Sequence, residues 1–324
     1  AVGNLGINIT IDGCTIKDNR IRGASGKNPR GAGMWFGLGV NCTIKGNTTI
    51  ENNKAHETGN EANLIGQGGG IQVDSGTLRI EDNTEIIGNG AKSGGGIYVQ
   101  GGVITLIGSA VVTPSSGSDE DKPGENDVYL ENGRKIKIVN ILTATAPVAR
   151  ITVPDANYAV TTQVLEAGSS VNLANEHTKF TVTPNGSEHW IVGNSGTLLN
   201  FGAISLDEIK VLESSMSPRL ITNRANLVNK LLFYKTSDGN YGVMVITEVN
   251  ATSNSGLGHI KFNYKTFNAD GTVKKNRDNC ELEGTYRFDL DAETAIENNY
   301  DFFLNNSTTQ NLAPQNNAIF YVLP

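Results

Sequence analysis

Residues 68 to 99 read GGGIQVDSGTLRIEDNTEIIGNGAKSGGGIYV and contain the run Gly-Gly-Gly-Ile twice, beginning at Gly68 and again at Gly94. Short stretches in which apolar and polar residues alternate lie between the two runs. Such alternation places successive side chains on opposite faces of a strand. Short strands that repeat after 26 residues, with turn residues between them, predict the coils of a β-solenoid rather than a flexible linker.

A second pattern precedes each glycine cluster. It consists of an aliphatic residue, a second aliphatic residue five or six positions on, and an asparagine three positions after that. Stacked copies would bury a column of aliphatic side chains, while glycine and asparagine turn the corners and stacked asparagines can form ladders. The copies are Ile11, Ile16 and Asn19; Ile44, Ile50 and Asn53; Ile80, Ile86 and Asn89; and a degenerate fourth, Leu106 with Val112 or Val111, in which Pro114 replaces the asparagine.

The strings GGGIQV, GGGIYV and IEDNTEIIGNGA resemble the repeats of bacterial surface proteins with a right-handed parallel β-helix, including the polymorphic outer-membrane-protein-like and autotransporter-passenger-like groups. The resemblance covers residues 1 to 114. It departs at Gly31, where the cluster reads GAGM, and these 114 residues contain no Phe-x-x-Asn motif. It implies a secreted or surface-anchored protein, often adhesive and mostly without known catalysis.

The predicted fold is all-β and has two domains. Residues 1–198 are expected to form the right-handed parallel β-helix, with the segment around Trp190 closing its end. Residues 199–324 lose the glycine signature and contain Asp-Gly pairs between alternating apolar runs, at Asp238 and Asp270. Asp-Gly in that setting is a strong hairpin signal. An antiparallel β-sandwich or small barrel is therefore expected there.

Charge and composition exclude several classes. The formal net charge of the 324 residues is −7 at pH 7, which argues against a nucleic-acid binder with a basic face. No transmembrane segment is expected, because no apolar stretch is long enough. No Cys-x-x-Cys pair occurs, so zinc or iron–sulfur cofactors are not expected. Cys14 and Cys42 are expected to be small buried thiols, with a disulfide between them as the open alternative.

Two long segments occur at the same point of consecutive copies. One separates Asn19 from Gly31 and the other separates Asn53 from Gly68, whereas four residues suffice between Asn89 and Gly94. Insertions at one corner should project side by side, and such loops often bind partners. Two solvated loops that pair weakly with each other are the alternative. The candidate binding residues are Arg20, Arg22, Lys27 and Arg30 in the first insertion and His56, Glu57 and Glu61 in the second.

Two segments of the chain contain closely spaced acidic residues. Residues 115–127 contain weak calcium candidates, but their spacing does not match an EF-hand, and a solvated acidic loop is the preferred reading. The string FDLDAE in the C-terminal half is read as an exposed polar edge or turn. The residues concerned are Asp119, Asp121, Glu125 and Asp127 in the first segment and Asp289 and Asp291 in the second.

These observations favour a non-enzymatic, secreted or cell-surface bacterial protein that is adhesin-like and binds a host or matrix protein or glycan. The parallel β-helix also hosts pectin-lyase-like enzymes, so a polysaccharide-active enzyme is one alternative. Such enzymes need carboxylates aligned on successive coils, and Asp18, Glu51 and Glu81 do not share a register, so no catalytic residue is assigned. A structural stalk with a C-terminal binding module is the other alternative.

Overall fold

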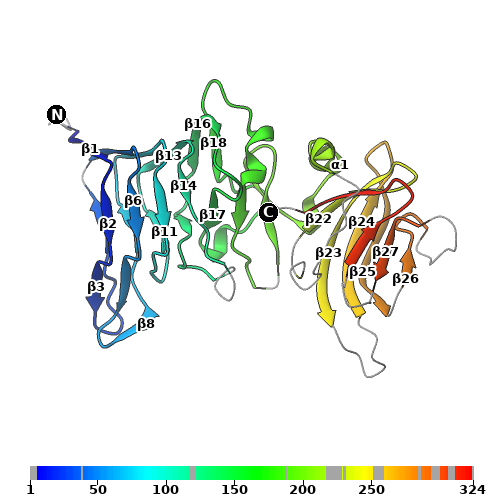
Figure 1. Ribbon diagram of the computed structural model, residues 1–324, viewed down its shortest axis with the longest axis horizontal. Coiled ribbons are helices and arrows are strands. Elements are labelled where there is room, and N and C mark those ends of the chain that lie inside the picture. The colour runs from blue at the N-terminus through cyan, green and yellow to red at the C-terminus, as the bar shows by residue number, and fades with distance from the viewer. Residues whose placement is uncertain are drawn as a thin grey trace. The chain divides into compact units, whose positions relative to one another are not determined.

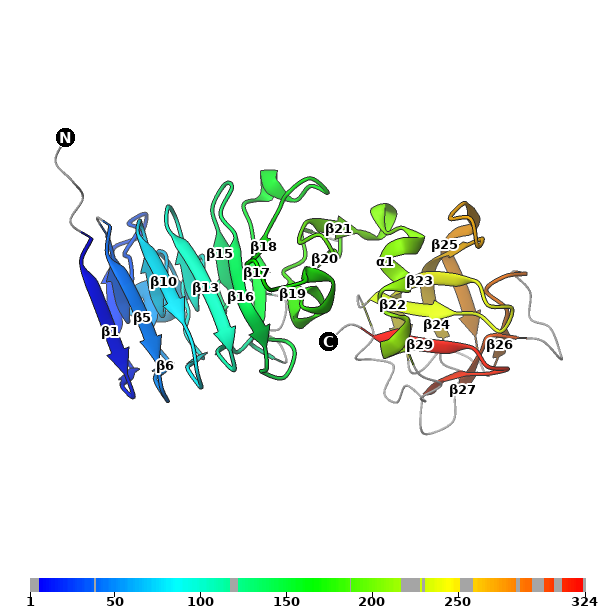
Figure 2. The same ribbon diagram turned by 90° about the horizontal axis from the view of Figure 1, so that it is seen from above.

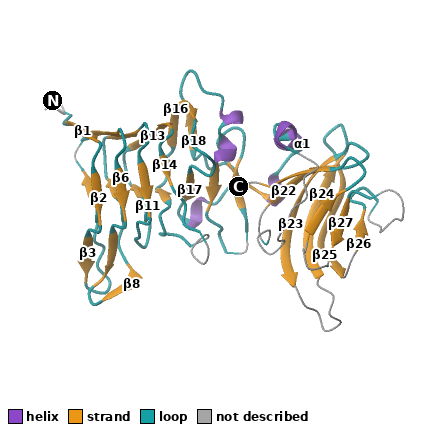
Figure 3. Ribbon diagram, viewed as in Figure 1, coloured by secondary structure: helices purple, strands orange, loops and turns teal. Residues whose placement is uncertain are grey.

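The computed structural model describes residues 6–37, 39–116, 122–186, 188–216, 228, 231–250, 259–283, 286–292, 300–305 and 311–322. The chain is almost entirely strand and loop (Figure 3), which confirms the all-β class. It divides into two compact units, Ala1–Leu199 with Pro324, and Asn200–Leu323.

The first unit is a parallel β-helix made of three sheets, and each neighbouring strand pair within these sheets is parallel (Figures 1 and 2). The first sheet contains β1 (Asn8–Asp12), β5 (Asn41–Lys45), β10 (Thr77–Ile80), β13 (Val103–Gly108), β16 (Ile136–Leu142) and β18 (Leu165–Ala167). The second contains β2 (Thr15–Lys17), β6 (Thr49–Glu51), β11 (Glu85–Ile87) and β14 (Val111–Val112). The third contains β4 (Met34–Phe36), β9 (Ile71–Val73), β12 (Ile97–Val99), β15 (Val128–Leu130), β17 (Ala149–Thr152) and β19 (Phe180–Val182).

The strand register confirms the aliphatic repeat. Equivalent residues of successive coils lie opposite one another and fill the interior of the β-helix. One column contains Ile11, Ile44, Ile80 and Leu106, and another contains Ile16, Ile50, Ile86 and Val112. All are fully buried except Ile11 and Ile16, which belong to the outermost described coil and are partly buried.

Close packing between coils explains the glycine triplets. The first glycine of each triplet has a left-handed backbone, with φ of 66° at Gly68 and 62° at Gly94. The third glycine lies directly against the next coil, because a Cβ on Gly70 would approach the Gly96 carbonyl oxygen to 2.6 Å. No real Cβ tolerates that distance, so the repeat requires glycine for both backbone conformation and space.

An asparagine ladder runs through the corner that precedes the triplets. The Nδ2 group of each asparagine donates to Oδ1 of the next, at 2.8 Å from Asn19 to Asn53, 3.0 Å from Asn53 to Asn89 and 3.0 Å from Asn89 to Asn126. The expectation that the fourth copy lacks its asparagine is therefore wrong. A long segment between β14 and Asn126 displaces this residue in the sequence but not in the fold.

The last part of the first unit includes β20 (Trp190–Val192), β21 (Leu198–Asn200) and three short 3-10 helices, η2 (Asp155–Asn157), η3 (Leu173–Asn175) and η4 (His177–Lys179). Trp190 is buried in the β-helix core, and its ring centroid lies 5.7 Å from that of Tyr158. Among the described residues of the whole chain, no helix has the length and apolar character needed to cross a membrane.

The second unit contains two antiparallel sheets and a short helix, α1 (Leu206–Lys210), flanked by η5 (Phe201–Ala203) and η6 (Glu213–Ser215). The larger sheet contains β25 (Val273–Glu283), β24 (His259–Phe267), β23 (Tyr241–Asn250), β22 (Leu231–Lys235) and β29 (Ile319–Val322). The smaller contains β26 (Tyr286–Phe288), β27 (Phe302–Asn305) and β28 (Asn311–Pro314). Phe262 of the larger sheet packs edge-on against Phe288 and Phe302 of the smaller, so the core lies between two layers, as in a sandwich.

All three cysteines are free thiols. Cys42 lies in β5, where burial raises its pKa to about 11. Cys14 is exposed, so the expectation of two buried thiols is wrong for this residue. The string CTIK occurs at both places, but Cys42 is an inward-facing strand residue whereas Cys14 precedes β2 at a corner.

Candidate functional site

The two long insertions form a small sheet of their own. It contains β3 (Arg20–Gly23), β7 (Lys54–Glu57) and β8 (Asn60–Leu64), with β3 and β7 parallel and β7 and β8 antiparallel. We call it the insertion sheet. It extends beyond the coils at the lower edge of the first unit in Figure 1. The insertions therefore lie side by side, as their positions in the sequence predicted.

Acidic residues neutralise part of the basic insertion. Arg20 Nε lies 3.6 Å from a Glu61 carboxylate oxygen, and Arg30 Nη1 lies 3.5 Å from Asp74 Oδ2. Arg22 and Lys27 are exposed and form no ion pair with any residue that the structure describes. Of the four predicted cations, these two are therefore the most open to an anionic ligand.

His56 and Glu57 are engaged within the insertion sheet. The His56 side chain is only 1% exposed, and its Nδ1 is 2.9 Å from the Glu57 carbonyl oxygen. Its Nε2 has no hydrogen-bond partner among the described residues and lies 3.9 Å from a Glu61 oxygen. Glu57 accepts a bond of 2.6 Å from Asn63 Nδ2. A ligand on the outer surface would reach Glu61 before His56.

Trp35 lies beside this corner and is not among the binding residues predicted from the sequence. Its side chain is 58% exposed, and its Nε1–H donates to Asp74 Oδ2 at 2.8 Å, the same oxygen that Arg30 contacts. Its place in the sequence could have indicated this exposure. In GAGMWF, Trp35 follows Met34, which aligns with the Ile of GGGI and packs against the core. Trp35 pairs in register with Gln72 of the next coil, and its exposure shows that its side chain faces outward.

The aromatic side chains of later coils that align with Trp35 are less exposed to solvent than Trp35 is. Tyr98 and Tyr129 stack with ring centroids 5.0 Å apart, and Tyr98 is only 2% exposed. The Tyr98 hydroxyl accepts from Gln67 Nε2 at 2.7 Å and donates to the Glu131 carboxylate. Burial is the main cause that raises the pKa of Tyr98, and it also raises the pKa of Tyr129, to about 12. This column is a structural network.

The acidic segment 115–127 is only partly described. Asp127 is buried, contrary to the solvated loop expected, because its carboxylate accepts from the Gly95 N–H at 2.8 Å and from the Thr152 hydroxyl at 2.5 Å. The Glu125 carbonyl oxygen accepts from Arg150 Nη2 at 2.6 Å. Asp119 and Asp121 lie outside the described residues. Asp127 thus holds adjacent coils together.

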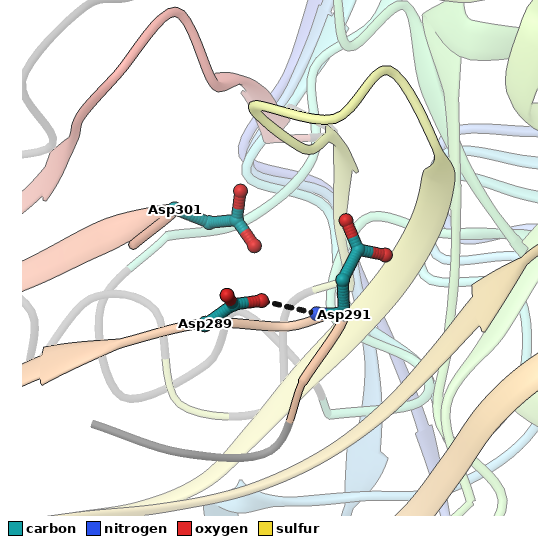
Figure 4. A group of neighbouring side chains, drawn as sticks. All are labelled: Asp289, Asp291 and Asp301. Atoms are coloured by element: carbon teal, nitrogen blue, oxygen red, sulfur yellow. Dashed lines mark hydrogen bonds between the residues drawn. The ribbon is translucent and has the colours of Figure 1, made fainter. Parts of the chain in front are cut away.

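Three carboxylates meet in the second unit. Asp289 and Asp291 follow β26, Asp301 precedes β27, and one carboxylate oxygen of each lies within 4.8 Å of the others (Figure 4). They are 5%, 6% and 0% exposed, respectively. The expectation that Asp289 and Asp291 form an exposed polar edge is therefore wrong. We call this group the aspartate cluster. Among the described residues, it is the one group of three His, Cys, Asp or Glu side chains close enough to share a metal ion.

Burial raises the pKa of Asp301 to about 6, and the neighbouring Asp289 charge acts in the same direction. Hydrogen bonds oppose this rise, because the backbone N–H groups of Ser237 and Leu290 donate to its two oxygens at 2.7 and 2.8 Å. Carboxylate burial without full charge compensation is costly, so this pKa reflects an environment that is short of positive charge.

No protein-family model matches the chain, and no curated protein or solved structure matches it either.

Proposed function

We propose that the protein is a non-enzymatic, adhesin-like protein that binds a host or matrix protein or glycan at a corner of its β-helix. The observation that carries this proposal is the insertion sheet. Two consecutive coils extend the same corner into paired strands, whereas the next coil turns there in the four residues Gly90–Ser93. The β-helix core does not require these strands, and long loops on a rigid repeat scaffold commonly bind partners.

The chemistry of this corner supports binding. Trp35 offers an exposed aromatic ring, and Arg22 and Lys27 offer positive charges outside the ion pairs of the described residues. Tryptophan and arginine are enriched among the residues that dominate binding energy. An acidic protein segment or a glycan carrying carboxylate or sulfate groups would complement this combination. The resemblance of the GGGI repeats to those of surface β-helix proteins supports an extracellular or cell-surface location.

Point variants test the proposal. The wild-type chain would be screened against matrix proteins and an array of neutral and acidic glycans, and the strongest ligand would then be titrated against Trp35→Ala and the double variant Arg22→Ala/Lys27→Ala. Each variant should weaken binding about tenfold or more, as expected for residues that dominate an interface.

The matched control removes two cations from the first β-helix sheet, in the double variant Arg79→Ala/Lys137→Ala, and should bind like the wild type. Equal weakening by both double variants would indicate a general charge effect. Unchanged binding by all variants would place the binding site elsewhere, for example in the second unit.

A further inference from the structure

The aspartate cluster places three carboxylates in a buried space with little positive charge. Lys274 Nζ lies 3.2 Å from Asp291 Oδ1, and Asn240 Nδ2 lies 3.2 Å from the same oxygen. The Asp291 side chain is 4% exposed, yet its other oxygen, Oδ2, is buried and has no hydrogen-bond partner among the described residues. Buried carboxylate oxygens are normally paired with a donor or a cation, and the described residues supply neither to this oxygen.

Backbone groups fix the orientation of the other two carboxylates. Asp289 Oδ1 accepts from the N–H groups of Asp291 and Ala292 at 2.8 and 2.9 Å, and Asp301 is held by Ser237 and Leu290. The three side chains come together around one space, as Figure 4 shows. The group is thus organised before any ion binds, which lowers the entropic cost of binding one.

We infer that the aspartate cluster is a calcium-binding site, with Asp289, Asp291 and Asp301 as its protein ligands. Carboxylate oxygens are the ligands of hard cations such as calcium and magnesium. Calcium–oxygen bonds of about 2.3–2.6 Å allow ligand oxygens to lie up to roughly 5 Å apart, whereas magnesium bonds of about 2.0–2.1 Å require a tighter octahedron. The three oxygens lie within 4.8 Å of one another, a separation that one calcium ion can bridge. Magnesium usually keeps several waters and is held by one or two carboxylates, so three nearly buried carboxylates fit calcium better.

Lys274 competes with the ion in this arrangement. Its side chain is 29% exposed, so its ammonium group can move into solvent when calcium takes its place beside Asp291. Removing this lysine should therefore tighten calcium binding. A purely structural ion pair would give no such effect, which makes the lysine variant the discriminating one.

The test is a calorimetric titration of the full chain, stripped with a chelator, with calcium chloride and separately with magnesium chloride. One calcium should bind, the melting temperature of the protein should rise with calcium, and magnesium should bind at least about tenfold more weakly. Asp291→Asn and Asp289→Asn should each weaken calcium binding by about tenfold or more, and Lys274→Met should strengthen it several-fold.

Circular dichroism would verify that each variant is folded. Asp289→Asn retains an oxygen that can accept the two backbone N–H bonds, so it remains informative if Asp291→Asn does not fold. Three outcomes overturn the inference. The first is no binding by the wild type up to about 10 mM calcium, a concentration above the dissociation constants of extracellular calcium modules. The second is weaker binding by Lys274→Met, and the third is loss of binding in Asp119→Asn/Asp121→Asn but not in Asp289→Asn.

Discussion

At the scale of single residues, the asparagine ladder links the coils most directly. Asn89 is 1% exposed and makes bonds on both sides: its Oδ1 accepts from the Asn53 N–H at 2.9 Å and from Asn53 Nδ2 at 3.0 Å, and its Nδ2 donates to the Ile50 carbonyl and to Asn126. In a buried setting, each lost partner leaves a polar group without compensation.

Asn89→Ala should therefore destabilise the β-helix by about 2–4 kcal/mol, because several buried groups lose their partners together. Asn83→Ala is the matched control, since Asn83 Nδ2 bonds Asn47 on the exposed surface. It should cost less than about 1 kcal/mol. Denaturant unfolding of both variants measures the difference, and equal costs would contradict the importance given to the buried ladder.

The sequence revealed the first three members of this ladder because their spacing is regular. It did not reveal Asn126, because the segment inserted after β14 moves this residue along the chain without changing its place in the coil. Trp35 was overlooked for a different reason. Alternation shows that it faces outward, but its exposure depends on which loops cover that face.

At the scale of elements, the coil corner decides whether the strands can stack. The N–H of Ile71 donates to the Gly96 carbonyl oxygen at 2.9 Å, and the Gly70 N–H donates to the Gly95 carbonyl at 2.8 Å. These bonds bring the backbones of two coils too close together for any side chain. The hairpins of the second unit are simpler, since Gly239 and Gly271 supply the positive φ that their turns need.

Gly70→Ala should destabilise the protein by about 2–3 kcal/mol, because the added methyl group meets a backbone carbonyl that cannot move without shifting a coil. Gly133→Ala is the comparison. Unlike Gly70, Gly133 has a positive φ, 73°, but nothing lies within 4 Å of its added Cβ, so backbone strain alone should cost about 1 kcal/mol. Thermal melts would separate the two, and a milder effect at Gly70 would contradict the packing explanation.

At the scale of the whole molecule, two units have separate hydrophobic cores. The core of the first is a column of aliphatic residues, and that of the second is aromatic, with Phe262, Phe288, Phe302 and Phe320 among its members. The sequence predicted both architectures from local patterns. The aspartate cluster could not be predicted, because Asp301 joins Asp289 and Asp291 only after β26 and β27 pair.

Residues 200–324 expressed alone should give a soluble unit that melts cooperatively, because its core is complete within that segment. Calorimetry or circular dichroism on this fragment would provide the measurement. A fragment that is soluble only when joined to the β-helix would show that it depends on the first unit for stability.

The most direct test of the proposed function replaces both insertions with the short corner of the third coil. Isolated bridges pair Lys54 with Gly90 and Gln67 with Ser93, so the sequence GAKS aligns with both ends of the second insertion. A variant with GAKS in place of residues 20–30 and 54–67 should retain the circular dichroism of the wild type and melt cooperatively. It should lose binding to the glycan or matrix protein that the wild type recognises. Undiminished binding by this folded variant would contradict the assignment of the binding surface to the insertion sheet.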